Sequence, residues 1–195
     1  MVILGQSRII HLSNIYVLKV CISRSFLTKL ASVVSHLKKV NPSLVYVCDP
    51  VMGDTGPGLY VPADLLPVYK SLILPLADVC LPNQFEAELL TDRKISSEED
   101  AREVMDFLHS KGPSTVILSS TELGNSEYLL GMASSVVDGV KTVVKVSIII
   151  LFNYLYFSLN CFLRLIFRSF QQHLLVQEIC SLLSVLLGFP KLTET

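Results

Sequence analysis

Two apolar segments of strand length, each ending at polar residues, constrain the fold more than any other feature of the sequence. Residues 44–48 (LVYVC) contain β-branched and aromatic side chains and lead directly to Asp49 and a proline. Residues 76–81 (LADVCL) repeat the pattern and are followed by Pro82 and Asn83. Because proline cannot donate to a β-ladder, each strand should end there. The pattern predicts neighbouring strands of an α/β sheet, with polar groups at the carboxyl ends where such sheets bind ligands.

Four oxygen-bearing side chains are expected at this edge of the sheet: Asp49, Asp54, Asn83 and Glu86. Such oxygens suit magnesium bound to a phosphate, because magnesium keeps most of its waters and needs only one or two carboxylates. A structural interpretation is also open. Aspartate is common in turns and asparagine at helix starts, and a glutamate in a first helical turn interacts favourably with the helix dipole.

Composition excludes several classes of function. The 195 residues suffice for one domain, and the net charge of −1, with scattered basic residues, gives no surface for nucleic acid. The five cysteines are odd in number and form no C-x-x-C pair, so neither a disulfide framework nor a zinc site is indicated. A reducing, cytosolic setting is the expectation.

Periodicity predicts the remaining elements. An amphipathic helix is expected over residues 25–39, with Phe26, Leu30, Val33, Val34 and Leu37 on its apolar face. Two more helices should begin near residues 61 and 96. A strand is expected at residues 115–120, and then a hairpin of strands 128–132 and 134–144 with a turn at Asp138-Gly139. Residues 1–15 show no periodic pattern.

Three strings in the chain resemble one known family: VYVCDPVMGD from Val45, YVPADLLPVYK from Tyr60 and PNQFEAELLT from Pro82. Together they resemble the middle of the pyridoxal kinases, members of the ribokinase-like superfamily. The resemblance spans residues 16–144 and implies a partial ribokinase-like α/β domain over residues 16–145, with a mainly parallel central sheet flanked by helices. It implies ATP-dependent phosphorylation of the 5′-hydroxymethyl group of pyridoxal, pyridoxine and pyridoxamine, which yields pyridoxal 5′-phosphate in vitamin B6 salvage.

The resemblance also implies a site. Asn83 and Glu86 match the superfamily's Asn-x-x-Glu motif, so these two and Asp54 are expected to hold magnesium. Leu81 stands where vertebrate pyridoxal kinases have threonine, which argues against a monovalent cation. ATP, magnesium, a possible homodimer and a cytosolic location are implied, with neither nucleic acid nor membrane as a partner. The residues expected to bind the nucleotide are Asp49, Asp54, Asn83, Glu86, Ser119 and Ser120.

The substrate-binding part of the family's sequence has no match in this chain. Family members have a longer N-terminal half, and residues 1–15 do not resemble it. Where a Gly-Tyr pair follows the family strand, this chain has Lys19, Val20 and Cys21. No substrate-binding residue can therefore be assigned.

The match also stops near Val144. The family's Gly-Thr-Gly-Asp loop, which supplies an anion hole and the catalytic base, is absent, so no catalytic residue is in frame. Instead, residues 146–163 are 18 uncharged residues, the length of a membrane span. Of the 16 basic and 17 acidic residues, only five lie beyond residue 145.

We interpret residues 146–195 as an aberrant apolar tail, predicted to be helical, that arises from a retained intron and a frameshift. Residues 145–147 can be encoded AAG-GTA-AGT, a consensus splice donor. A one-base shift in possible codons for residues 175–183 spells Gly-Thr-Gly-Asp-Leu-Phe-Ala-Ala. The chain itself is therefore expected to be nearly inactive. The alternatives are a non-catalytic fragment, a dimer-forming decoy, a membrane-anchored kinase-like remnant, or a kinase for another small alcohol such as hydroxymethylpyrimidine.

Overall fold

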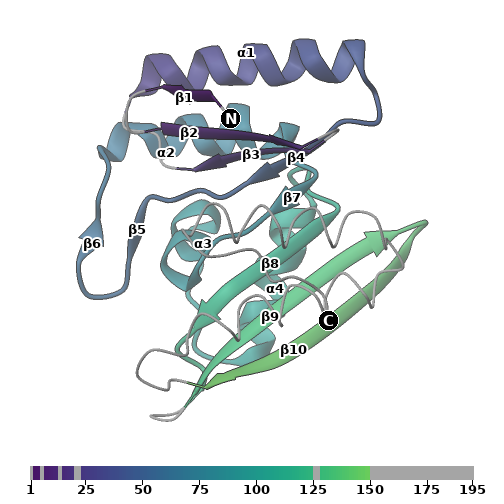
Figure 1. Cartoon of the computed structure of the whole chain (residues 1–195). Coiled ribbons are helices and arrows are strands. Elements are labelled where there is room, and N and C mark those ends of the chain that lie inside the picture. The colour runs from purple at the N-terminus through teal and green to yellow at the C-terminus, as the bar shows by residue number, and fades with distance from the viewer. Residues whose placement is uncertain (1, 5–6, 13–14, 20–22, 125–127, 150–195) are drawn as a thin grey trace, which may run out of the picture.

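A computed structural model describes residues 2–4, 7–12, 15–19, 23–124 and 128–149. Within them, eight strands form one sheet in the order β1-β2-β3-β4-β7-β8-β9-β10 (Figure 1). The strands of this sheet are β1 (Val2–Leu4), β2 (Ser7–Leu12), β3 (Ile15–Lys19), β4 (Val45–Cys48), β7 (Val79–Cys80), β8 (Thr115–Thr121), β9 (Tyr128–Val137) and β10 (Val140–Ile149).

The sheet is mixed, which corrects the expectation of a mainly parallel one. Its centre, β3-β4-β7-β8, is parallel, while β1, β2, β9 and β10 pair antiparallel with their neighbours. The connections explain the difference, because parallel neighbours need long crossovers whereas a tight turn joins only antiparallel strands. Asp138 (φ 51°) and Gly139 (φ 77°) form such a turn between β9 and β10.

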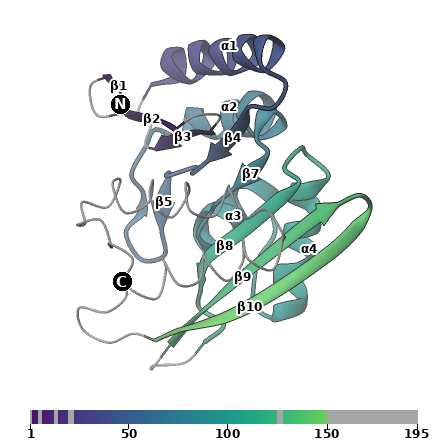
Figure 2. The same cartoon turned by 45° about the vertical axis from the view of Figure 1, so that its right-hand side comes forward.

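Helical segments supply the crossovers between the parallel strands. They are α1 (Arg24–Val40), the continuous segment η1 (Ala63–Leu65), α2 (Leu66–Val68), η2 (Tyr69–Ile73) and η3 (Leu74–Leu76), and then α3 (Gln84–Thr91) and α4 (Glu98–His109). Helix α1 packs beside the segment from η1 to η3, and α3 and α4 lie together against β8, as Figure 2 also shows. The buried core lies between these helices and the sheet.

The core face of α1 differs from the predicted one at Val33. Leu27, Leu30, Ala31 and Val34 are buried, whereas Val33 is 53% exposed. A helix turns by about 100° per residue, so Val33 lies well to the side of the stripe that contains Val34. Phe26 and Leu37 are only partly buried against the core.

The two ends of the described region differ from expectation in part. Strands β1 and β2 lie in residues 1–15, where no pattern was found. Strand β10 continues past residue 145 to Ile149, so the first four residues of the predicted helical tail are strand. Residues 150–195, and the possible frameshift they would carry, lie outside the described residues. Among the described helices, none combines the length and the apolar character that crossing a membrane requires.

We predict that the two sides of α1 respond differently to truncation. Leu27 is completely buried, so Leu27→Ala should lower the free energy of unfolding by about 2–5 kcal/mol through lost contacts and a cavity. The matched Val33→Ala change, on the exposed side of the same helix, should alter it by less than about 0.5 kcal/mol. Urea denaturation of the full chain measures both. Equal losses would contradict this placement of the helix.

Candidate functional site

The carboxyl ends of β4, β7 and β8 lie side by side and are joined by backbone hydrogen bonds. The Leu81 amide donates to the Cys48 carbonyl at 2.9 Å, and the Ser119 amide donates to the Pro82 carbonyl at 3.0 Å. The segments that follow these strands therefore meet at one edge of the sheet, as the sequence predicted for the first two strands. Asp49 follows β4 directly and is half-buried there.

Asn83 is the N-cap of α3, as the structural interpretation of the sequence predicted. Its side-chain Oδ1 accepts from the Glu86 amide at 2.9 Å, and the Glu86 Oε2 accepts from the Asn83 amide at 3.0 Å. This reciprocal pair is a capping box, which satisfies two amides that the first turn of a helix leaves without partners. The Asn-x-x-Glu spacing thus has a local structural cause.

The same two side chains also hold the loop that follows β4. Glu86 Oε1 accepts from the Met52 amide at 2.8 Å and lies 3.5 Å from the Gly53 amide. Asn83 Nδ2 donates to the Gly53 carbonyl at 2.9 Å. Residues 52–53 are therefore fixed to the start of α3, across the gap between two strand ends.

Gly53 fits this position because it has no side chain. A Cβ there would lie 2.4 Å from the Gly58 carbonyl oxygen and 2.6 Å from a ring carbon of Phe85. Gly53 opens a small hairpin of β5 (Gly53–Asp54) and β6 (Gly58–Leu59), which extends away from the large sheet (Figure 1). The close approach of the hairpin to α3 thus depends on this glycine.

Glu86 is only 3% exposed, and burial of its carboxyl group raises the pKa from 4.5 to about 7. The backbone amides of Asn83 and Met52 lower the pKa, but the negative charge of Asp49 raises it further. A buried carboxyl group that is hard to ionise, with a second carboxylate nearby, fits a site for a cation, because positive charge would favour both ionised forms. The all-oxygen donor set also fits magnesium.

The other predicted residues are less closely involved. Asp54 is exposed and its Oδ1 accepts from the Thr55 amide at 2.8 Å, as in a turn. Ser119 and Ser120 are half-buried within an irregularity of the β8–β9 register between Leu118 and Thr121. In the described part of the chain, no three His, Cys, Asp or Glu side chains form a metal-binding cluster.

Gln84 connects the start of α3 to two distant backbone groups, and it was not among the residues predicted from the sequence. Its Oε1 accepts from the Glu122 amide at 2.7 Å, just beyond β8, while its Nε2 donates to the Ile95 carbonyl at 2.9 Å. Gln84 therefore links the start of α3 to the end of β8. Its position directly after the N-cap indicates that its backbone is held in the first turn of the helix. Its side-chain partners are distant in the sequence and could not be predicted from it.

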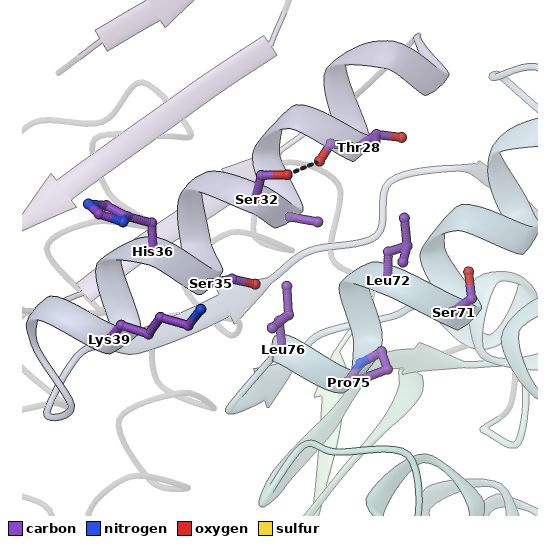
Figure 3. A pocket seen from close by; sticks show the side chains of 10 residues that line it. Thr28, Ser32, Ser35, His36, Lys39, Ser71, Leu72, Pro75 and Leu76 are labelled. Atoms are coloured by element: carbon purple, nitrogen blue, oxygen red, sulfur yellow. Dashed lines mark hydrogen bonds between the residues drawn. The ribbon is translucent and has the colours of Figure 1, made fainter.

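A separate hollow lies between α1 and the segment from η2 to η3. It measures about 610 Å³. Its lining combines apolar residues, such as Leu72 and Leu76, with polar ones, such as Ser35, His36 and Lys39 (Figure 3). No residue predicted for nucleotide or metal binding lines it. The hollow and the edge of the sheet that carries Glu86 are distinct features.

We predict that Glu86 makes stability depend on pH. The folded chain keeps the Glu86 proton up to about pH 7, whereas the unfolded chain loses it near pH 4.5. The contribution of protonated Glu86 to the free energy of unfolding is therefore fully present below pH 4.5 and is lost as the pH rises through 7. Between pH 5 and 8 the free energy of unfolding should fall by about 2.5 kcal/mol. Urea denaturation across this range should show the decline. In Glu86→Gln the decline should be smaller by that amount, and identical slopes would contradict the prediction.

Comparisons with known proteins agree with this architecture. The sequence model of the phosphomethylpyrimidine kinase family matches residues 25–142. The pyridoxal kinase of Ovis aries is 56% identical over 117 residues, which cover 57% of this chain and 38% of that protein. The chain thus spans well under half the length of this relative.

Two solved structures share the fold. Pyridoxal kinase from Leishmania donovani in complex with ADP and pyridoxamine has a TM-score of 0.60 at 26% identity, covering 67% of this chain and 47% of that one. PdxK of Plasmodium falciparum with AMP-PNP and PL has a TM-score of 0.66 at 26% identity, covering 71% and 50%. The chain belongs to the phosphomethylpyrimidine kinase family and is a homologue of the pyridoxal kinases.

Proposed function

We propose that this chain carries the nucleotide-binding and magnesium-binding part of a kinase that phosphorylates the 5′-hydroxymethyl group of vitamin B6 vitamers. The observation that carries the proposal is the buried Glu86 carboxyl group, held with Asn83 at the carboxyl edge of the parallel strands. Ligands of α/β sheets bind at this edge. The kinship with pyridoxal kinases supplies the substrate class.

In this proposal the residues at the carboxyl edge of the parallel strands have different roles. Glu86, Asn83 and Asp54 would hold magnesium, mostly through water, and magnesium would supply positive charge that neutralises phosphate oxygens. Asp49 adds a second carboxylate beside Glu86. Ser119 and Ser120 offer hydroxyl groups to the nucleotide from the end of β8.

Leu81 has no side-chain oxygen, so we assign no monovalent cation to this edge. By the same kinship we propose a cytosolic location and a homodimer. Residues 16–145 form the kinase-like unit in this proposal, and residues 146–195 form the tail, whose first four residues continue β10.

The proposed chemistry needs positioning and charge neutralisation more than covalent help from the protein. The fixed loop at residues 52–53 and the capped start of α3 provide rigid backbone for that purpose. The 195 residues contain no Gly-Thr-Gly-Asp sequence, so the base and the anion hole expected from the family have no counterpart in them.

The nucleotide assignment predicts a selective effect of Glu86. Magnesium AMP-PNP should bind to the full chain, and Glu86→Gln should weaken the binding about ten-fold or more, because a charge-assisted contact to the cation is lost. Glu88→Gln is the matched control, since Glu88 lies on the same helix but pairs with Lys94 at 2.6 Å. Isothermal titration calorimetry measures all three proteins. Equal affinities of the two variants, or no binding by the unmodified chain, would contradict the assignment.

We predict that the 195-residue chain turns over poorly. Loss of a general base or of an anion-stabilising donor commonly lowers the rate by about a hundred-fold or more. With ATP, magnesium and either pyridoxal or hydroxymethylpyrimidine, coupled ADP release should therefore stay at least a hundred-fold below that of a complete pyridoxal kinase assayed alongside. Ordinary turnover of pyridoxal would refute this prediction, and preference for the pyrimidine would change the proposed substrate.

A further inference from the structure

The sheet places two cysteines opposite each other at its centre. Cys48 on β4 and Cys80 on β7 are register partners in neighbouring parallel strands. Both are free thiols, exposed by only 1% and 0%. Neither cysteine has a role in the proposed phosphoryl transfer.

The spacing of neighbouring strands meets the Cα separation that a disulfide requires. Neighbouring strands lie about 4.8 Å apart, which falls inside the range of about 4.4–6.8 Å between the Cα atoms of disulfide-bonded cysteines. Register partners of a parallel pair also carry their side chains on the same face of the sheet. Cys48 and Cys80 both belong to the buried core on that face.

The surroundings favour the reduced thiols at rest. Interaction with the neighbouring Cys48 thiol and burial raise the pKa of Cys80 well above its ordinary value. Tyr46, two residues before Cys48, belongs to the same core, and burial raises its pKa as well. Since the thiolate is the reactive form, the pair reacts only when the ends of β4 and β7 open transiently.

We propose that Cys48 and Cys80 form an oxidation site that a peroxide converts to a disulfide across β4 and β7 and that a dithiol reduces back by thiol–disulfide exchange. One thiolate attacks a peroxide oxygen and becomes a sulfenic acid, and the O–O bond breaks to release water. The second sulfur then attacks the sulfenic sulfur, a second water leaves, and the S–S bond forms. In sum, two thiols and one hydrogen peroxide give one disulfide and two waters.

The position of the pair connects it to the edge of the sheet that carries Glu86. Cys48 directly precedes Asp49, and Cys80 precedes the segment that leads to Asn83. The Leu81 amide already donates to the Cys48 carbonyl at 2.9 Å, so the two strand ends are coupled through the backbone. A covalent bond would add a second link between them.

The test is disulfide mapping of the full chain after exposure to hydrogen peroxide. Remaining thiols are alkylated in denaturant, and the digest is analysed by mass spectrometry with and without dithiothreitol. We expect a linked pair of peptides that contain Cys48 and Cys80, with the loss of two hydrogens and of two alkylation sites, and with recovery of both sites on reduction. This readout needs no nucleotide, so it is independent of the proposed function.

Two variants sharpen the outcome. A chain with Cys21→Ser, Cys161→Ser and Cys180→Ser keeps only the proposed pair and should lose both alkylation sites together. Adding Cys80→Val to that chain leaves Cys48 alone, and its loss by oxidation should slow at least ten-fold. The proposal is wrong if both thiols of the unmodified chain stay alkylatable, or if each oxidises separately to a sulfinic acid with no linked peptide.

Discussion

The contacts of one buried carboxyl group tie together the part of the molecule to which we assign function. Glu86 accepts hydrogen bonds from the Met52 and Asn83 amides, so it joins the loop after β4 to the start of α3. An unpaired buried carboxyl group would be costly, and these amides are what make its burial tolerable. They do not fully offset the desolvation, because the pKa still rises to about 7. Ionising the Glu86 carboxyl group is therefore unfavourable in the free chain, and a bound cation would stabilise the ionised form.

The rest of the fold places this carboxyl group. Parallel pairing of β4, β7 and β8 brings three strand ends to one edge, and the helical crossovers between these strands build the core beneath them. Gly53 lets the loop approach α3, and Gln84 connects α3 to the segment beyond β8. The antiparallel strands at both margins extend the sheet without contributing to this edge. Structural and functional interpretations of the Asn-x-x-Glu motif are therefore compatible, since the cap also presents the carboxyl group.

Local signals predicted much of this arrangement, because they depend on neighbouring residues. The strand before Asp49, the helix that begins at Asn83 and the turn at Asp138 follow from proline, capping and turn chemistry. Val33 was misplaced because an apolar residue beside a helical stripe looks like a member of it. The antiparallel pairs other than the β9–β10 hairpin could not be predicted from periodicity, which does not report strand direction.

Contacts between residues far apart in the sequence were also not predicted. The bond from Met52 to Glu86 spans 34 residues, and that from Glu122 to Gln84 spans 38. Neither has a signature in the chain, since backbone amides are the donors. The pairing of Cys48 with Cys80 likewise depends on the register between β4 and β7.

The most direct test of the central claim is amide hydrogen exchange with and without magnesium AMP-PNP. If the edge that carries Glu86 binds the nucleotide, protection should increase in peptides that cover residues 49–59, 81–88 and 117–122. The segments 28–39 and 71–76, which line the separate hollow, should be unchanged. Protection confined to those two segments, or no change anywhere at saturating nucleotide, would contradict the account.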